Sequence, residues 1–199
     1  MPIAEFLTIL ISLFAITDPL GAVPAFMAVF GKADKRKIKK ASAEAALAVF
    51  ILLAFFSLLG TFILTSLGIS STAFLIAGGI LLLVLAFDFI SGKTPRTRTV
   101  EKEPSDVVVP IATPLLAGPG AITSSIYFTQ TYGALATISS IIIVSVICFL
   151  FLFFSYGISR FIGKNGLKVL SRIMGIITAA IAISLIEKAL VIYGVIRVV

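Results

Sequence analysis

The feature that constrains this chain most is a pair of hydrophobic segments, each interrupted by glycine and proline. The first interruption reads Thr17-Asp18-Pro19-Leu20-Gly21, and the second reads Ala117-Gly118-Pro119-Gly120-Ala121. Pro19 and Pro119 lie 100 residues apart, about half the chain length. In a membrane protein, a pair of broken helices at matching places in two halves indicates a binding site near the bilayer midplane.

The composition places nearly the whole chain in lipid. Hydrophobic residues make up 59% and charged residues 13% of the 199 residues, and the mean hydropathy is +1.18. A soluble domain is about half apolar and a quarter charged. We therefore expect one all-α membrane domain over residues 1–199. The chain has no histidine, one cysteine (Cys148, assigned to packing) and no phosphate-binding loop, so we expect no metal, no cofactor and no ATP-driven cycle.

Six segments are long and apolar enough for a spanning helix, which needs about 20 residues. They cover residues 4–30, 43–66, 72–91, 107–131, 134–157 and 167–190. Three spans in each half mean that the second half enters the membrane from the opposite side. The sequence therefore predicts six transmembrane helices in a 3+3 inverted repeat. Repeat 1 covers about 1–91, a cytoplasmic linker covers 92–106, and repeat 2 covers about 107–199; spans 1 and 4 are the broken helices.

A second match between the halves lies in spans 3 and 6. Ile76-Ala77-Gly78-Gly79-Ile80 in span 3 resembles Ile173-Met174-Gly175-Ile176-Ile177 in span 6. Small residues at these places would let helix backbones approach closely.

The basic residues predict the orientation. The regions between spans 1 and 2, 3 and 4, and 5 and 6 carry 14 of the 16 Lys and Arg residues, and six spans place all three on one face. The positive-inside rule puts that face in the cytoplasm and both termini outside. We therefore expect a multi-pass protein of the cell (inner) membrane with no nucleic-acid partner, and unspecific contact with anionic lipid headgroups. The sequence leaves homo-oligomerisation open.

The interruptions themselves predict a buried binding site. Asp18-Pro19 fits a helix N-cap followed by the first helical residue, and Gly118-Pro119 fits the same positions more weakly. Two helix N-termini would present N–H groups to a carboxylate, while nearby carbonyls would accept from an ammonium group, so a small zwitterion fits between them. The predicted substrate-binding residues are Thr17, Asp18, Pro19, Leu20, Gly21, Ala117, Gly118, Pro119, Gly120, Ala121 and Thr123, with Ser124 and Ser125 as nearby hydroxyls.

Asp18 is the one acidic residue well inside a predicted span. A carboxylate at that depth is a functional hypothesis by default, because it could pair with a substrate ammonium group or carry a coupling proton. The alternative is that Asp18 only caps its half-helix, and the two roles are compatible. The second half has Gly118 in its place, so any charge chemistry is asymmetric.

Around these residues the chain resembles the MarC-like family of integral membrane proteins. The resemblance rests on Asp18-Pro19-Leu20-Gly21-Ala22-Val23-Pro24 and on Pro114-Leu115-Leu116-Ala117-Gly118-Pro119-Gly120-Ala121-Ile122-Thr123. Through length, span count and motif placement it extends over essentially the whole chain. It implies transport of small neutral amino acids such as glycine and alanine. Members often have Asn where this chain has Asp18, which favours the capping role.

These observations predict a secondary transporter of small neutral amino acids that alternates access around a midplane site, with Asp18 as the candidate for proton coupling. The alternative is an exporter of other amino acids or small metabolites. A channel is disfavoured because no ring of charge or filter-like repeat is visible. An enzyme is disfavoured too, because the chain lacks the His of a rhomboid-like protease and the flanking glycines of an aspartyl one.

Overall fold

The fold is a bundle of helices in a computed structural model that describes residues 3–31, 33–91 and 116–196. Predicted linker 92–106 and the first part of predicted span 4, residues 107–115, lie outside the described residues. The described helices are α1 (Ile3–Thr17), α2 (Pro19–Phe30), α3 (Lys35–Ser66), α4 (Ser71–Ser91), α6 (Pro119–Tyr132), α7 (Ala134–Phe153) and α8 (Ser155–Ile192).

Five helical segments within the described residues are long and apolar enough to cross a membrane. They are α1 with most of α2 (Ile3–Met27), α3, α4, α7 and the part Asn165–Ile192 of α8. The prediction of an all-α membrane protein is therefore confirmed. α6 has 14 residues and falls below the length that a span requires.

Helix boundaries differ from the prediction at the end that carries most basic residues. α3 begins at Lys35 instead of residue 43, because Asp34 caps it by accepting the N–H of Lys37 at 2.8 Å. α7 ends at Phe153 instead of residue 157. The region expected to be a loop before span 6 is helical, since α8 begins at Ser155 and bends at Gly163, where φ is 70° and ψ is 168°. Hydropathy missed these turns because they contain polar and charged residues.

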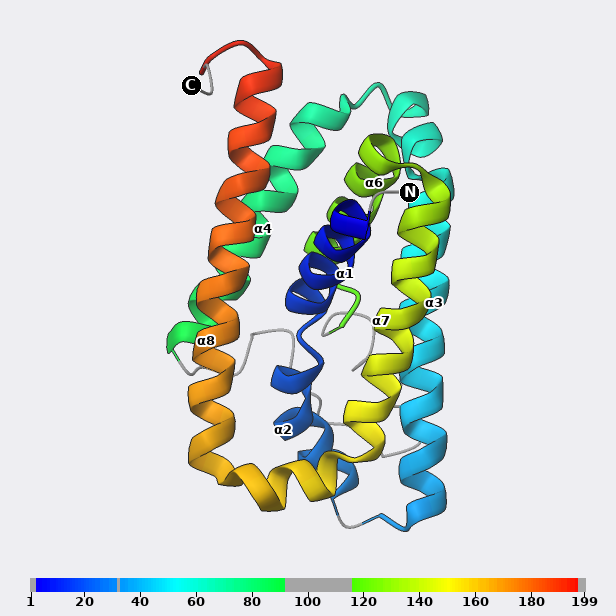
Figure 1. The fold of residues 1–199 in the computed structure, drawn as a ribbon, viewed down its shortest axis with the longest axis vertical. Helices are drawn as coiled ribbons and strands as arrows, with labels where there is room; N and C mark the ends of the chain where they lie inside the picture. Colours follow the sequence, from blue (N-terminus) through cyan, green and yellow to red (C-terminus); the bar gives the residue numbers. More distant parts are fainter. Residues whose placement is uncertain (1–2, 32, 92–115, 197–199) are drawn as a thin grey trace.

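The ends of the helices lie in two groups, above and below the middle of the bundle. The start of α3 and the first turns of α8 lie at the lower end in Figure 1, whereas α1 begins and α8 finishes toward the upper end. α1 descends into α2, and α6 begins near mid-height and rises. Two helices therefore start inside the bundle instead of at its ends.

Close helix contacts hold this arrangement together. α4 packs along α8, α3 packs along α7, and α1 lies against both α6 and α7. A Cβ on Gly79 would come within 2.6 Å of Ile186 Cγ1, and one on Gly175 within 2.9 Å of Phe89 Cβ. The early part of α4 thus meets the late part of α8, so these two helices run antiparallel, and the glycines allow their backbones to approach.

Candidate functional site

The junction between α1 and α2 is a left-handed residue that caps a helix. Asp18 has φ 41° and ψ 63°, and it is the one non-glycine residue with positive φ among those described. Its Oδ1 accepts the N–H of Gly21 at 2.9 Å. Asp and Asn tolerate this backbone conformation better than other non-glycine residues. The predicted N-cap role of Asp18 is therefore confirmed.

Gly21 belongs to the same structural unit as Asp18. A Cβ at position 21 would overlap Oδ2 of the Asp18 carboxylate. The carboxylate occupies the space that a side chain would need, so the cap and the glycine require each other. The Asp18 side chain is buried, at 2% exposure.

The carbonyl that Pro19 leaves without a helical partner is satisfied by another helix. Pro19 has no N–H, so Ala15 C=O cannot make its i+4 hydrogen bond. Thr178 of α8 donates its hydroxyl to this carbonyl at 3.3 Å and is fully buried. Thr17 Oγ1 donates to Phe14 C=O at 3.2 Å. Sequence reasoning missed Thr178, because only the packing of α8 against α1 brings its hydroxyl to this carbonyl.

The start of α6 is built differently. Gly118 has the extended angles φ −66° and ψ 172°, Pro119 is the first helical residue, and no side chain among the described residues caps the helix. Gly120 packs so closely on α4 that a Cβ there would overlap Leu82. A Cβ on Gly78 of α4 would likewise overlap Thr123. The first turns of α6 are therefore held tightly against α4.

Hydroxyl groups line the second turn of α6. Thr123 Oγ1 donates to Pro119 C=O at 2.8 Å, and Ser125 Oγ donates to Ile122 C=O at 2.8 Å. Ser124 Oγ is fully buried and has no hydrogen-bond partner among the described residues. Leaving a buried hydroxyl unpaired costs about 1–3 kcal/mol. Ser124 therefore suits a polar group bound in this part of the bundle.

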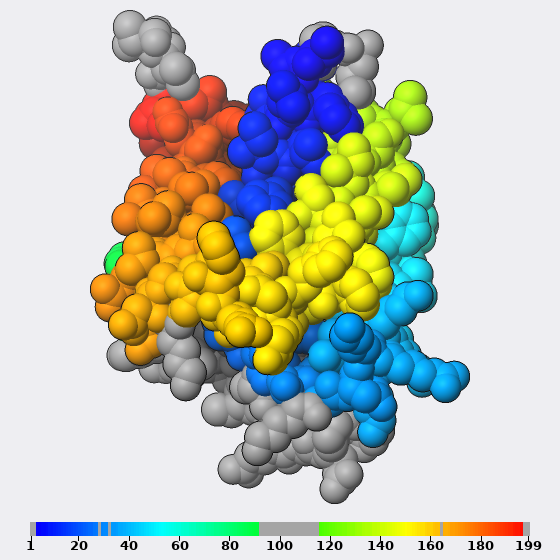
Figure 2. Space-filling model, turned by 60° about the horizontal axis from the view of Figure 1, so that its bottom comes forward, coloured from blue at the N-terminus to red at the C-terminus, as the bar shows by residue number. Residues whose placement is uncertain are grey.

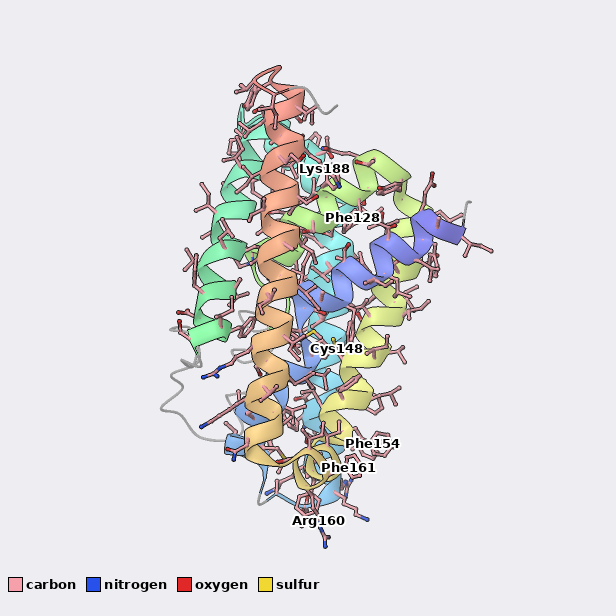
Figure 3. All side chains as sticks on the ribbon, turned by 60° about the vertical axis from the view of Figure 1, so that its left-hand side comes forward. Phe128, Cys148, Phe154, Arg160, Phe161 and Lys188 are labelled. Carbon is pink, nitrogen blue, oxygen red and sulfur yellow. The ribbon has the colours of Figure 1, made fainter. Side chains whose placement is uncertain are left out.

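Cys148 of α7 also lies at the α1–α2 junction. Its side chain is fully buried, and its thiol lies beside the Thr17 hydroxyl and near the Asp18 carboxylate. Figure 3 shows Cys148 at the height where α1 gives way to α2. The sequence favoured a packing role and gave no signal for this position, because the contact depends on how α7 packs against α1.

The predicted site residues divide between two helix starts. Most of these residues are buried, but Leu20 and Gly118 are half-buried and Pro119 is exposed. α1, which ends at Thr17, packs against α6, which begins at Pro119. The described residues hold no cluster of three or more His, Cys, Asp or Glu side chains that could bind a metal ion.

Comparison with known proteins gives a family match over nearly the whole chain. The family model described as MarC family integral membrane protein matches residues 3–193. The chain belongs to the MarC family. The MarC chain is 34% identical over 187 residues to a UPF0056 membrane protein of Pyrococcus horikoshii, covering 92% of this chain and 93% of the relative.

Bacterial relatives of this MarC chain are similar over comparable lengths. A UPF0056 membrane protein of Escherichia coli is 33% identical over 187 residues, with 88% of this chain and 87% of the relative covered. One from Bacillus subtilis is 30% identical over 194 residues, with 92% of each chain covered. These names give membrane location and no substrate. No solved structure matches the MarC chain.

The two helix starts of this MarC protein differ in charge. A helix N-terminus carries a partial positive charge of about half a unit. The N-terminus of α2 has a carboxylate of the protein within hydrogen-bonding distance, whereas no side chain in the described part of the chain caps α6. The start of α6 is therefore suited to an external anion, and the Asp18 carboxylate adds a negative charge that is suited to a cation.

Proposed function

We propose that this MarC protein is a secondary transporter of small neutral amino acids, with a midplane site formed by the starts of α2 and α6. The observation that carries the proposal is the pair of proline-led helix starts inside the bundle, one capped by Asp18 and the other without a side-chain cap. Non-helical backbone at membrane depth is tolerated where it is buried in protein or lines a watered cavity. Two such places in one small bundle favour a site for a polar ligand.

The charges favour a zwitterion over a simple ion. The first N–H groups of α6 would receive the substrate carboxylate, because the N-cap residue Gly118 has no side chain to occupy them. Asp18 and nearby carbonyls would receive the ammonium group, as would the hydroxyl of Thr17. Ser124 offers a buried hydroxyl to either group. The tight contacts of Gly120 with Leu82 and of Thr123 with Gly78 favour a small substrate side chain.

A 3+3 inverted repeat is part of the proposal, and contacts between α4 and α8 support it. Gly79 approaches Ala182 and Ile186 of α8, and Gly175 approaches Ala86 and Ile90 of α4. The α4 residues in these contacts each have a counterpart of the same type in α8, 96 positions later in the chain. The pairs are Gly79 and Gly175, Ala86 and Ala182, and Ile90 and Ile186. Equivalent residues of α4 and α8 thus make equivalent contacts with the other helix, as expected when a two-fold axis relates the two helices. The sequence match had paired Gly78 with Gly175, so its register is corrected by one residue.

Burial in α3 and α7 supports the same repeat. Seven buried positions of α3 recur as buried positions of α7, each 95 residues later in the chain. The pairs are Ala41 and Ala136, Ser42 and Thr137, Ala45 and Ser140, Ala46 and Ile141, Val49 and Val144, Leu53 and Cys148, and Ser57 and Leu152. In this scheme α6 belongs to the predicted fourth span, 107–131, whose first part lies outside the described residues.

The proposed orientation follows from the basic residues. Lys35, Arg36, Lys37, Lys39 and Lys40 are exposed at the start of α3, and Arg160, Lys168 and Arg172 are exposed on α8. We assign this end to the cytoplasm and both termini to the outside of the cell membrane. A rocking motion of one repeat against the other would then expose the site to each side in turn.

The alternative is an exporter of other amino acids or small metabolites, which would use the same helix starts. Uptake of labelled glycine and alanine into proteoliposomes tests the proposal, with efflux from preloaded vesicles measured in the same preparation. We expect both substrates to move. Protein that neither moves nor binds them contradicts the proposal, and movement of larger amino acids instead favours the alternative.

Proton coupling through Asp18 is the final part of the proposal. An imposed pH gradient should drive accumulation in wild-type vesicles, and Asp18→Asn should leave only transport down the amino-acid gradient. If the pH gradient drives amino-acid accumulation equally well in Asp18→Asn, Asp18 does not carry the coupling proton.

A further inference from the structure

The first eight residues of α8, Ser155–Ile162, form a short helical elbow at the lower end of the bundle. Gly163 separates them from the part that crosses the membrane, through its φ of 70° and ψ of 168°. Figure 1 shows the elbow running across the bundle before α8 rises. The elbow is therefore neither a spanning segment nor a loop.

The elbow exposes aromatic side chains, which are unfavourable in water. Phe161 is 95% exposed, Tyr156 is 58% exposed, and Phe154 just before the elbow is 56% exposed. Ser155 is buried, and Ile158 and Ile162 are half-buried toward the bundle. Figure 3 shows Phe154 and Phe161 at the lower end of the molecule. Tyr is enriched at the membrane–water boundary, and Phe is common on the apolar face of helices that lie in it.

A positively charged side chain, that of Arg160, lies on the same outer face of the elbow. Arg160 is exposed and adjoins Phe161 in the chain; it lies near Phe154 and Phe161 in Figure 3. The start of α3, where five exposed basic residues gather, lies beside the elbow in Figure 2. This end of the molecule therefore combines exposed aromatic area with positive charge, and both features complement an anionic lipid surface.

We propose that the elbow is a binding site for the headgroup of an anionic phospholipid. Phe154 and Phe161 enter the boundary between headgroups and acyl chains, as the apolar face of an interfacial helix does. Arg160 donates two parallel hydrogen bonds to the lipid phosphate, a geometry that suits the planar guanidinium group better than a lysine ammonium. The site anchors α8 at its bend. It is independent of the substrate proposed above.

The absence of tryptophan from the chain makes a direct test possible. Phe161→Trp gives a protein with one indole fluorophore at the proposed site. Phe55→Trp, an exposed position within the apolar part of α3, gives the matched reporter for the hydrocarbon interior. Both variants are reconstituted in phosphatidylcholine vesicles that contain a minor fraction of brominated lipid, either phosphatidylcholine or phosphatidylglycerol.

We expect bromine near the headgroup to quench the Phe161→Trp protein more than bromine deep in the acyl chain, and the opposite order for the Phe55→Trp protein. Brominated phosphatidylglycerol should quench the Phe161→Trp protein more than brominated phosphatidylcholine does at equal content. Adding Arg160→Gln should lower that preference about fivefold, the loss of about 1 kcal/mol from one basic residue near the surface. Arg172→Gln, at an exposed arginine on the same helix beyond the bend, should leave the preference unchanged.

Three results would overturn the proposal. The first is emission from the Phe161→Trp protein that is typical of an indole in water and insensitive to brominated lipid. The second is equal quenching by the two brominated lipids. The third is a preference that survives Arg160→Gln, or that Arg172→Gln removes equally, because the charge would then act from the whole surface and not from this site.

Discussion

The starts of α2 and α6 share a proline but solve the capping problem in opposite ways. In α2, Asp18 is left-handed, its carboxylate caps the helix, and Gly21 leaves room for that carboxylate. In α6, Gly118 is extended and offers no side chain, and Ala121 stands where α2 has Gly21. Asp18 occurs with Gly21 in the first half, and Gly118 occurs with Ala121 in the second. The N-cap residue and the third helical residue therefore change together between the two helix starts. One start is completed by the protein, and the other is suited to a ligand.

The start of α3 shows that the backbone does not forbid a carboxylate at position 118. Asp34 caps α3 with φ −68° and ψ 160°, close to the φ −66° and ψ 172° of Gly118. The third residue of α3 is Lys37, so a side chain at the third helical position, where α6 has Ala121, does not hinder a cap with extended backbone angles. An Asp at position 118 could therefore cap α6 as Asp34 caps α3. The proposed binding of a substrate carboxylate would use the N–H groups that such a cap would occupy.

Gly118→Asp should have the largest effect, because its carboxylate would take the place of the substrate carboxylate. We expect amino-acid uptake to fall about tenfold or more, since a charge-assisted hydrogen bond contributes about 1.5–3 kcal/mol. The protein should stay folded, with thermal stability unchanged or raised by the new cap. Gly68→Asp adds the same charge in an exposed turn, where φ is 67° and Asp is tolerated better than most residues, and should transport normally. Normal uptake by Gly118→Asp would show that the start of α6 binds no anion.

Gly21→Ala tests the other half of the comparison. The added Cβ overlaps the Asp18 carboxylate, so the cap should break and the protein should lose about 1–3 kcal/mol of stability. Gly157→Ala is the control, because a Cβ at that exposed helical position meets nothing within 4 Å. It should be neutral or slightly stabilising. Thermal unfolding in detergent measures both, and equal stability of the two variants would contradict the proposed dependence of the cap on Gly21.

Asp18→Asn separates the charge of Asp18 from its role as a cap. Asn caps helices as well as Asp and tolerates the left-handed conformation, so stability should change by less than about 0.5 kcal/mol. Affinity for glycine should fall about tenfold, the loss of one charge-assisted hydrogen bond. Asp34→Asn makes the same change at an exposed cap and should alter neither property. Wild-type affinity in Asp18→Asn would reduce Asp18 to a structural cap.

Thr178→Val should have the smallest effect. The substitution removes the hydroxyl that donates to Ala15 C=O, the carbonyl left without a partner by Pro19. Hydrogen bonds between helices in membranes contribute about 0.5–1.5 kcal/mol, and we expect a loss of that size in thermal unfolding. Thr65→Val is the control, because the exposed Thr65 hydroxyl donates only within its own helix. A loss no greater than that of the control would mean that the freed carbonyl is satisfied in another way.

Sequence reasoning was sound where local chemistry decides the structure. Hydropathy predicts the membrane helices, and Asp18-Pro19 and Gly118-Pro119 predict the helix starts at Pro19 and Pro119. The left-handed angles of Asp18 and the role of Gly21 as space for its carboxylate were not predicted, because both depend on side-chain packing. Thr178 and Cys148 were also missed as neighbours of the junction, since only the packing of α7 and α8 brings them there.

The bend in α8 was missed for a different reason. The segment Ser155–Ile162 mixes polar, charged and aromatic residues, so hydropathy assigned residues 155–157 to the end of the fifth span and the rest to a loop. A helix that lies at a membrane boundary, as proposed above for this segment, has a mixed composition that a hydropathy window does not represent. Asp34 extended α3 in a similar way, by capping a turn of basic residues.

The central claim is that the uncapped start of α6 and the carboxylate of Asp18 bind the two ends of one zwitterion. Thermal-shift measurements with glycine, glycinamide and acetate test it most directly, because the last two each lack one of the charges. We expect glycine to stabilise the wild-type protein at concentrations where glycinamide and acetate do not, and Gly118→Asp to abolish the shift. Equal stabilisation by glycinamide, or a glycine shift that survives in Gly118→Asp, would contradict the claim.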